Sequence, residues 1–318
     1  MHTAHILTKT VCTAADSVIQ EVRKLSYICT VCPRQCGILR DDTTLSDGVC
    51  KMPANPRLAR AALHFGEEPC ISGTNGSGTV FFSGCSLSCQ FCQNHDISHG
   101  GFGETVTIQR LAEIFKELEA LGAHNINLVN PTHYAVAIRK ALELYKPAMP
   151  IVYNSSGYER VETLHSLEGL VDIYLPDLKY IHADIAQKLS GAADYFDFAS
   201  TAIMEMARQT GSVQLDQNGL MQRGTMVRHL VLPGHTRESL DVLSWLKDIK
   251  DRVWVSLLFQ YTPMRDIDRF PSLSRKLTQR ECDKVFAFMQ DCGIINGYVQ
   301  DRTSSGSEMI PTFDLTGI

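Results

Sequence analysis

The sequence predicts an α/β fold in which six parallel strands, each followed by a helix, form an open, partial (β/α)6 barrel. Short apolar segments alternate with segments of helical periodicity from residue 79 onward, a pattern typical of a parallel sheet covered by helices. Only six such pairs are present, whereas a closed barrel needs eight. In sheets of this kind the chemistry lies at the carboxyl ends of the strands, so we expect functional residues there.

Each expected strand is a short apolar run bounded by turn residues. The strands are expected at Thr79–Gly84, Ile126–Asn130, Pro150–Asn154, Val171–Pro176, Met226–Pro233 and Trp254–Phe259. The helices are expected at Thr107–Gly122, Tyr134–Lys146, Glu159–Leu167, Ala183–Leu189, Thr201–Gln209 and Arg237–Ile249. A last helix is expected to begin at a capping box made by Thr278 and Glu281.

Changes of composition divide the chain into three parts. Residues 1–72 carry a short amphipathic helix, Ala14–Leu25, and a cysteine-rich, turn-rich stretch that we expect to be a small N-terminal metal-binding module. A glycine-rich turn, Gly73–Gly78, marks the boundary. Residues 73–300 hold the alternating strands and helices, and residues 301–318 form a C-terminal tail.

Composition and charge exclude several classes of protein. The 318 residues are 44% hydrophobic, enough for a large core, and their net charge is −5. The acidic balance disfavours nucleic acid as the main partner. No run of about 18 apolar residues is present, so we expect no membrane-spanning helix. The first residues lack the pattern of a secretory signal and the cysteine count is odd, so we expect a cytoplasmic protein with reduced thiols.

Three cysteines stand together directly after the first expected strand. Cys85, Cys89 and Cys92 have the spacing C-x3-C-x2-C, so a single loop can bring three thiolates to one polynuclear metal centre. A 4Fe–4S cluster held by three cysteines leaves one iron with open positions, to which a small chelating ligand can bind. A zinc site or three buried thiols without a metal are the alternatives, but zinc prefers four ligands in paired spacing.

This loop, with an aromatic residue before its last cysteine and a strand before its first, resembles the cluster loop of the radical S-adenosylmethionine (SAM) superfamily. The resemblance implies a TIM-like partial barrel, a 4Fe–4S cluster on the three cysteines, and SAM bound to the open iron. It also implies that the reduced cluster cleaves SAM to methionine and a 5′-deoxyadenosyl radical, which abstracts hydrogen from a substrate.

Further segments are similar to one branch of that superfamily, the pyruvate formate-lyase activating enzymes and uncharacterised proteins like them. The segments are Cys89-Gln-Phe-Cys92-Gln-Asn94, Asp177-Leu-Lys179, Val227-Arg228-His-Leu-Val-Leu-Pro-Gly234 and Leu257-Leu-Phe-Gln-Tyr261. The resemblance implies that Arg228 binds the SAM carboxylate, that Lys179 contacts SAM and that Asp177 orders the loop. The other expected cofactor contacts in these segments are Phe91, Gln93, Asn94 and Gln260.

One segment departs from the pattern of that branch. The branch has Gly-Gly-Glu after its second strand, where it holds the SAM amino group, and this chain has Asn130-Pro-Thr-His-Tyr134 instead. We expect Asn130 and Thr132 to supply the polar contacts there. This segment, Asn154-Ser-Ser-Gly-Tyr158 and the N-terminal cysteines resemble those of the uncharacterised proteins of the branch.

A second group of cysteines has the spacing C-x2-C-x3-C-x13-C. It consists of Cys29, Cys32, Cys36 and Cys50. Four soft ligands with a tight pair predict a second, closed metal site, either structural zinc or an auxiliary iron–sulfur cluster. The spacing leaves both metals open. Cys70 stands apart from both groups, and we expect it to be a buried core residue, with a role near the cluster as the alternative.

The sequence therefore predicts a radical SAM enzyme, an oxidoreductase that abstracts hydrogen from a protein substrate. Flavodoxin or ferredoxin is the expected electron donor. The same chemistry on RNA or on a small metabolite is the first alternative, although the acidic charge argues against RNA. A non-catalytic iron–sulfur or zinc sensor that binds partners through its cysteines is the second alternative.

Overall fold

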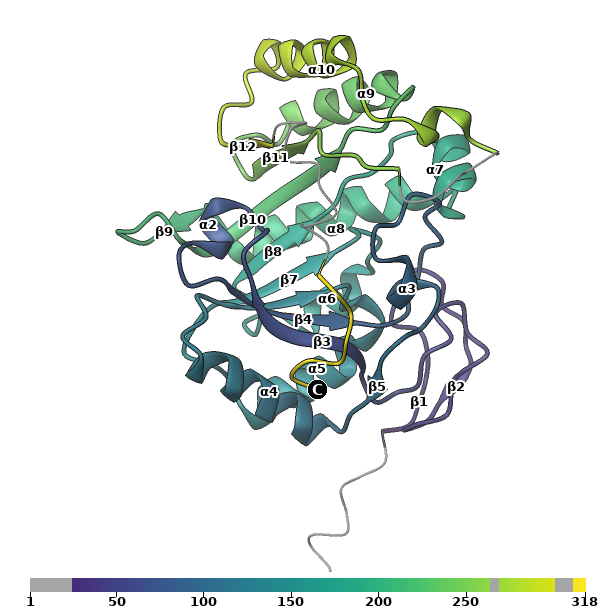
Figure 1. Ribbon diagram of the computed structural model, residues 1–318, viewed down its shortest axis with the longest axis vertical. Helices are drawn as coiled ribbons and strands as arrows, with labels where there is room; N and C mark the ends of the chain where they lie inside the picture. Colours follow the sequence, from purple (N-terminus) through teal and green to yellow (C-terminus); the bar gives the residue numbers. More distant parts are fainter. Residues whose placement is uncertain (1–24, 264–268, 301–310) are drawn as a thin grey trace, which may run out of the picture.

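The computed structural model describes residues 25–263, 269–300 and 311–318, so the expected helix Ala14–Leu25 lies outside the described residues except for Leu25. Ten strands form the main sheet (Figure 1). They are β3 (Arg57–His64), β4 (Ser77–Phe82), β5 (Glu104–Thr105), β6 (Ile126–Val129), β7 (Ile151–Ser155), β8 (Ile173–Pro176), β9 (Gln214–Leu215), β10 (Met221–Leu230), β11 (Trp254–Leu258) and β12 (Gly297–Gln300). Their order is β12-β11-β10-β8-β7-β6-β4-β3-β5, with β9 paired to β10.

The strands expected from the sequence are all present. They are β4, β6, β7, β8, β10 and β11, which follow one another in the sheet and run parallel. The prediction of a mixed α/β fold with a mostly parallel sheet is therefore confirmed, and the open sheet is consistent with a partial barrel. One further parallel strand, β12, pairs with β11 and was not expected.

Helices follow the strands at the expected places. They are α4 (Ile108–Ala120), α5 (Ala135–Leu144), α6 (Val161–His165), α7 (Ala183–Ser190), α8 (Tyr195–Thr210), α9 (Thr236–Lys247) and α10 (Gln279–Asp291). The capping box of Thr278 and Glu281 at the start of α10 is confirmed. Helix α8 begins at Tyr195 rather than Thr201, because its first turn buries Tyr195 and Ala199 in the core.

The two faces of the sheet are covered by different elements. Leu128 of β6 and Tyr153 of β7 pack in one core with α4 and α5. Side chains alternate along a strand, so Val152 of β7 points to the opposite face. There it packs against Ile71 of the short helix α2 (Pro69–Ser72), which Figure 1 shows in front of β8 and β10. Helix α2 therefore covers the face of the sheet that α4 and α5 leave free.

Strand β3 lies in the part of the chain before the expected boundary at residues 72 and 73. It pairs with β4 antiparallel from Leu58 to His64, and β5 pairs with its other edge. Its sequence, Arg57–His64, is rich in alanine and leucine, which favour helices, and pairing with β4 overrides that preference. The main sheet thus extends into residues 1–72, and the division of the chain into modules stays a proposal.

The last residues of the chain return to β3. The backbone N–H of Leu315 donates to the Ala59 carbonyl oxygen at 3.1 Å, and that of Ala61 donates to the Thr316 carbonyl oxygen at 2.8 Å. Phe313 packs edge-on against Phe81 of β4 at 5.4 Å between ring centroids. Residues 311–318 therefore bind the sheet along the edge of β3.

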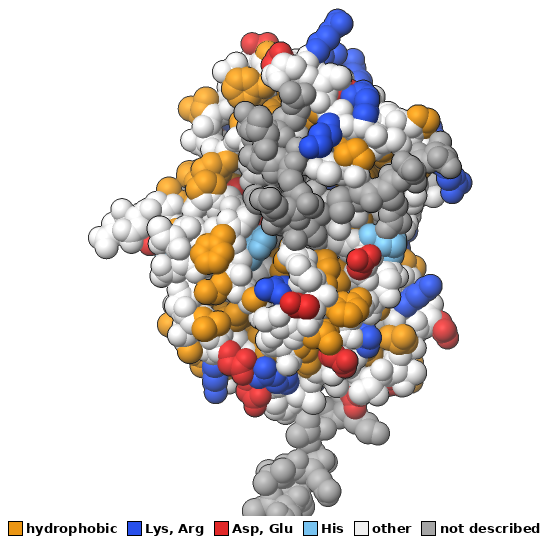
Figure 2. Space-filling view, viewed as in Figure 1, with side chains coloured by type: hydrophobic (Ala, Val, Ile, Leu, Met, Phe, Trp, Pro, Cys, Tyr) orange, Lys and Arg blue, Asp and Glu red, His pale blue; other side chains and the backbone are white. Residues whose placement is uncertain are grey.

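The described surface carries charges of both signs. Figure 2 shows Lys and Arg side chains interspersed with Asp and Glu over one face, with apolar side chains between them. None of the helices in the described ranges is long and apolar enough to cross a membrane.

Candidate functional site

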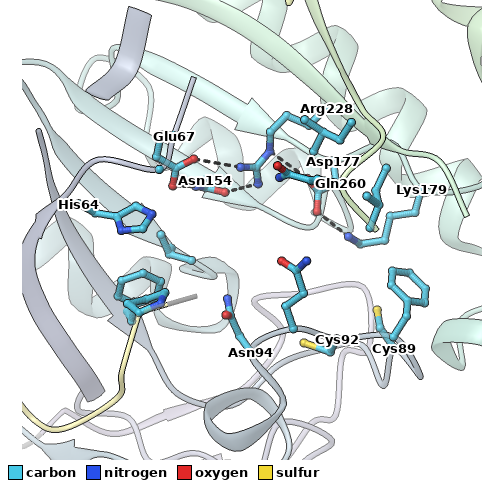
Figure 3. Close-up of a pocket in the computed structure, with 18 residues that line it drawn as sticks. His64, Glu67, Cys89, Cys92, Asn94, Asn154, Asp177, Lys179, Arg228 and Gln260 are labelled. Carbon is cyan, nitrogen blue, oxygen red and sulfur yellow. Dashed lines mark hydrogen bonds and ion pairs between the residues drawn. The ribbon is translucent and has the colours of Figure 1, made fainter. Parts of the chain in front are cut away.

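A cavity of about 260 Å³ opens at the carboxyl ends of the parallel strands. Figure 3 shows Glu67, Asn154, Asp177, Lys179 and Arg228 on one side of it, with thiols on the other. The lining residues are His64, Gly66, Glu67, Phe81, Cys89, Phe91, Cys92, Gln93, Asn94, Val129, Asn154, Asp177, Lys179, Arg228, Leu230, Leu258, Gln260 and Pro311. The cavity lies where the sheet topology places functional residues.

Backbone pairing brings three polar residues to the same face of the sheet near the carboxyl ends of its strands. Asn154 lies in β7, Asp177 directly follows β8, and Arg228 lies in β10. Asp177 and Arg228 form a parallel β-bridge, and the Asp177 N–H donates to the Ser155 carbonyl oxygen at 2.9 Å. Gly157 is required behind Asp177, because a Cβ at Gly157 would lie 2.1 Å from the Asp177 carbonyl oxygen.

Arg228 is the centre of a hydrogen-bond network. Its Nε donates to Asp177 Oδ1 at 3.1 Å and its Nη2 to Asn154 Oδ1 at 2.5 Å. Lys179 Nζ contacts the other oxygen of Asp177, Oδ2, at 2.5 Å. Burial alone would raise the pKa of Asp177, but Lys179 and Arg228 outweigh burial and hold that pKa below its usual value. Asp177 is therefore ionised between two cations.

Glu67 completes this network, and the sequence did not predict it. Its Oε2 accepts from Arg228 Nη1 at 3.3 Å, and its Oε1 accepts from the amides of Asn127 at 3.0 Å and Asn154 at 3.2 Å. Glu67 lies just before α2, which is held in place by a bond from Asn125 Nδ2 to the Ile71 carbonyl oxygen. Nothing in the sequence around Glu67 signals this role, because its partners come from distant strands.

The expected cluster cysteines follow β4 on one loop, and Cys89 and Cys92 line the cavity. Ser190 Oγ donates to Cys89 Sγ at 2.9 Å, and the Leu87 N–H donates to Cys85 Sγ at 3.4 Å. Burial raises the pKa of Cys89 to about 11, although the nearby Lys179 lowers it. Thiolates in such surroundings need a cation, which a bound metal supplies.

The donor set therefore fits an iron–sulfur cluster: three thiols on one loop, with hydrogen-bond donors aimed at two of the sulfurs. The described residues contain no group of three or more His, Cys, Asp or Glu arranged to hold a single ion, and this applies to both cysteine groups.

The other cavity residues expected from the loop and from β11 are also in place. Phe91 packs edge-on against Tyr180, 6.5 Å between ring centroids, and lines the cavity beside Gln93 and Asn94. Gln260 follows β11, and its Oε1 is buried and has no hydrogen-bond partner within the described ranges. An unpaired buried acceptor is costly, so this oxygen is a natural contact for a ligand.

Asn130 and Thr132, which the sequence predicted as cofactor contacts, are not among the residues that line the cavity. Asn130 adopts a left-handed backbone with φ 60°, and its side-chain amide donates to the carbonyl oxygen of Gly84, just before the cysteine loop. Thr132 lies in a 3-10 turn, η1 (Thr132–Tyr134), and donates to the buried Glu159 carboxylate at 2.5 Å. Both residues contact parts of the scaffold rather than the cavity.

The remaining cysteines of the described ranges are not among the residues that line the cavity. Cys29, Cys32, Cys36 and Cys50 are free thiols in the segment that contains the two-stranded sheet of β1 (Tyr27–Ile28) and β2 (Leu39–Arg40). Cys70 is 1% exposed and packs with Ile71 beneath the sheet, as expected of a core residue.

Comparisons with known proteins agree with the chemistry of the loop. A family model described as the Radical SAM superfamily matches residues 79–246, more than half of the chain. The uncharacterized protein MJ0674 of Methanocaldococcus jannaschii is 29% identical over 284 residues, which are 85% of this chain and 76% of that protein.

Two solved structures are similar to the chain at lower sequence identity. SuiB of Streptococcus suis has a TM-score of 0.43 at 10% identity, over 71% of this chain and 48% of SuiB, so the chain spans about half of SuiB's length. A domain of a pyruvate-formate lyase-activating enzyme from Bacteroides vulgatus has a TM-score of 0.37 at 11% identity, over 54% of this chain and 91% of that domain.

The buried carboxyl of Glu159, behind the cavity, makes the stability of the protein depend on pH. Burial raises the pKa of Glu159 to about 7, and the hydrogen bond from Thr132 offsets only part of this. The unfolded chain ionises this carboxyl at its lower, ordinary pKa, so the free energy of unfolding falls as pH rises towards 7 and levels off above it. The glutamine variant lacks this ionisation. We therefore expect the free energy of unfolding of Glu159→Gln, relative to that of the wild type, to rise from pH 5 to pH 8, by about 1.4 kcal/mol for each unit by which the Glu159 pKa is raised.

Urea denaturation at pH 5 and pH 8 measures this difference. The exposed Glu162→Gln, on the same segment, is the matched control and should show no pH-dependent gain. An equal stability difference at both pH values for Glu159→Gln would contradict the raised pKa.

Proposed function

The chain belongs to the radical SAM superfamily, and we propose that it is an activating-enzyme-like member that abstracts hydrogen from a protein substrate. Family membership brings a 4Fe–4S cluster and SAM as cofactors and makes the chain a radical SAM enzyme, which disfavours the sensor hypothesis. When bound, these cofactors supply a 5′-deoxyadenosyl radical as the hydrogen acceptor. The residues of the chain bind, orient and shield them.

One observation supports this function above all others: two cysteines of the expected cluster loop and the Arg228 network face each other across a single cavity (Figure 3). We propose that Cys85, Cys89 and Cys92 hold the cluster. SAM carries a carboxylate and an ammonium group, and the opposite wall of the cavity offers partners of both signs. The cavity therefore matches the charges of SAM.

Arg228 suits the carboxylate of SAM. Three of its N–H groups donate to Asp177, Asn154 and Glu67, and a guanidinium has five, so two remain for a ligand. The three partners fix the plane of the guanidinium, which lowers the entropy lost when a carboxylate binds. Lys179, anchored on Asp177, adds a second positive charge.

Glu67 suits the ammonium group of SAM. This chain lacks the Gly-Gly-Glu segment of the activating enzymes, and Glu67 places a carboxylate in the cavity from a different part of the chain. Among the described residues, Arg228 is the one donor to its Oε2, which can accept from a second donor as well. Among the other lining residues, Phe91, Leu230, Leu258 and Gln260 are the proposed contacts of the adenosine.

The protein substrate is supported by the motifs shared with the activating enzymes and by the surface charge. Lys and Arg are interspersed with Asp and Glu over the face in Figure 2, and the net charge is −5, neither of which favours RNA. The proposed electron donor is flavodoxin or ferredoxin.

Loss of one cluster cysteine tests the enzymatic proposal. We expect Cys85→Ala, Cys89→Ala or Cys92→Ala to abolish the cluster assigned to the loop and the release of 5′-deoxyadenosine together, because each thiol is one of only three ligands. Iron and sulfide analysis and product detection after anaerobic incubation with SAM and a reductant measure both. Cys292→Ala, at the end of α10, is the control and should keep both. SAM cleavage by any of the three loop variants would contradict the assignment of the cluster to these cysteines.

The proposed contacts of the SAM carboxylate and of the SAM ammonium group are tested separately. We expect Arg228→Lys and Glu67→Gln each to raise the dissociation constant for SAM about 10- to 100-fold, since each removes a charge-assisted hydrogen bond or its fork geometry. Equilibrium dialysis with anaerobic protein measures the affinity, and iron content should stay at the wild-type level. Arg60→Gln, which removes an exposed ion pair with Asp314, is the control. An affinity for SAM equal to that of the wild type in either variant would exclude that residue as a SAM contact.

The substrate class is tested by isotope transfer. We expect deuterium to pass from a deuterated protein fraction into 5′-deoxyadenosine, because the radical takes hydrogen from its substrate. Parallel incubations with deuterated RNA and with deuterated small metabolites are the two other arms. Transfer from either of these, and none from protein, would replace the protein substrate.

A further inference from the structure

We propose that Cys29, Cys32, Cys36 and Cys50 form a second, closed metal centre. The buried Arg40 balances the negative charge of this centre, and the centre stabilises the position of the loop that begins at Cys85. In the described structure the four side chains are free thiols that are not arranged around a single ion, so the proposal includes that they close around the metal when it binds. The proposal stands on the local backbone, on the buried charge of Arg40 and on the contacts between the two cysteine loops.

The backbone folds tightly around these thiols. The Gly37 N–H donates to the Cys29 carbonyl oxygen at 2.9 Å, and the Gln35 N–H donates to the Cys32 carbonyl oxygen at 3.0 Å. Gln35, just before Cys36, and Lys51, just after Cys50, have left-handed φ values of 39° and 56°. Such strain in residues other than glycine persists only where the surroundings hold it in place.

The segment has only a small core to hold this strain by packing. Strands β1 and β2 have two residues each, and although Val31 and Met52 pack in the core, four large apolar side chains of the segment are exposed: Ile28 59%, Leu39 63%, Leu45 58% and Val49 55%. Small irregular segments of this kind are usually stabilised by a disulfide or a metal. Because the described structure joins none of the four thiols in a disulfide, a metal is the cross-link that we propose.

Arg40 supplies the strongest sign of a missing anion. It is 0% exposed, and its donors bind neutral acceptors: the carbonyl oxygens of Met52, Pro53 and His133 and the hydroxyl of Tyr27. In the described part of the chain it has no ion pair with a carboxylate. A buried cation without an anion is costly.

The thiols provide that anion once they bind a metal. Arg40 pairs with Tyr27 across β1 and β2, two residues from Cys29, and its Nε donates to the carbonyl oxygen of Met52, two residues after Cys50. Four thiolates around one divalent ion, or around an iron–sulfur cluster, carry a net negative charge that a guanidinium balances. Arg40 therefore lies where the metal centre needs a positive partner.

The same segment contacts the loop of the first cysteine group. Arg34, between Cys32 and Cys36, donates from Nε to the Ser86 carbonyl oxygen at 2.9 Å and from Nη2 to the Gly191 carbonyl oxygen at 2.7 Å. Gly84, just before Cys85, packs so closely on Cys50 that a Cβ there would lie 2.9 Å from the Cys50 carbonyl oxygen. A metal that fixes the N-terminal loop therefore also fixes the start of the Cys85 loop.

The decisive experiment measures metal in a chain without the first group. In full-length protein carrying Cys85→Ala, Cys89→Ala and Cys92→Ala, purified without oxygen, we expect a stoichiometric metal centre to remain. Iron with acid-labile sulfide identifies a cluster, and zinc without sulfide identifies a structural zinc site; either supports the proposal. Adding Cys29→Ala and Cys36→Ala should remove this metal, whereas adding Cys292→Ala should not. A metal-free triple variant, or metal that persists without Cys29 and Cys36, overturns the centre.

This experiment does not depend on SAM cleavage, so the centre and the enzymatic proposal fail separately. The role of Arg40 is tested in the same background. We expect Arg40→Gln to weaken metal retention against a chelator about 10- to 100-fold, as is typical for residues that support metal ligands. Arg40→Lys, which keeps the charge, should retain the metal better, and circular dichroism checks that both variants fold. Equal metal loss from Arg40→Gln and wild type overturns the counter-charge role.

Discussion

The cavity depends on the charge of one residue, Arg228. Its side chain is 16% exposed, and its guanidinium is held by three acceptors that come from β7, from the end of β8 and from the segment before α2. A cation in such a place is tolerated only while its partners are present. Asp177 in turn holds Lys179. The residues that surround the cavity therefore act as one electrostatic unit, and the sheet is the frame that fixes their spacing.

The parts of the fold that local sequence determines were predictable. Apolar runs located the six central strands, and Thr278 with Glu281 located the start of α10, because these signals lie within a few neighbouring residues. Strand β3 was missed because its alanine and leucine residues favour a helix, and only its pairing with β4 decides otherwise.

The residues of the candidate site were likewise predictable only where they belong to a recognisable local segment. Arg228, Asp177 and Lys179 were found because each lies in a recognisable segment at a strand end. Glu67 was not, since no pattern links it to Arg228, which is 161 residues away. Asn130 stands at the expected strand end, but its left-handed backbone directs its amide to Gly84. The orientation of a side chain after a strand depends on backbone angles that a motif does not specify.

The connection between Glu67 and Arg228 has a consequence for biosynthesis. Chains emerge from the ribosome N-terminus first, so Glu67 and the cysteine loop are exposed to solvent well before Arg228 is translated. In the described structure the Glu67 carboxylate is also bound by the amides of Asn127 and Asn154, which are translated before Arg228. The wall of the cavity that carries Arg228 is thus the last of these parts to be synthesised, well after the cysteine loop that faces it.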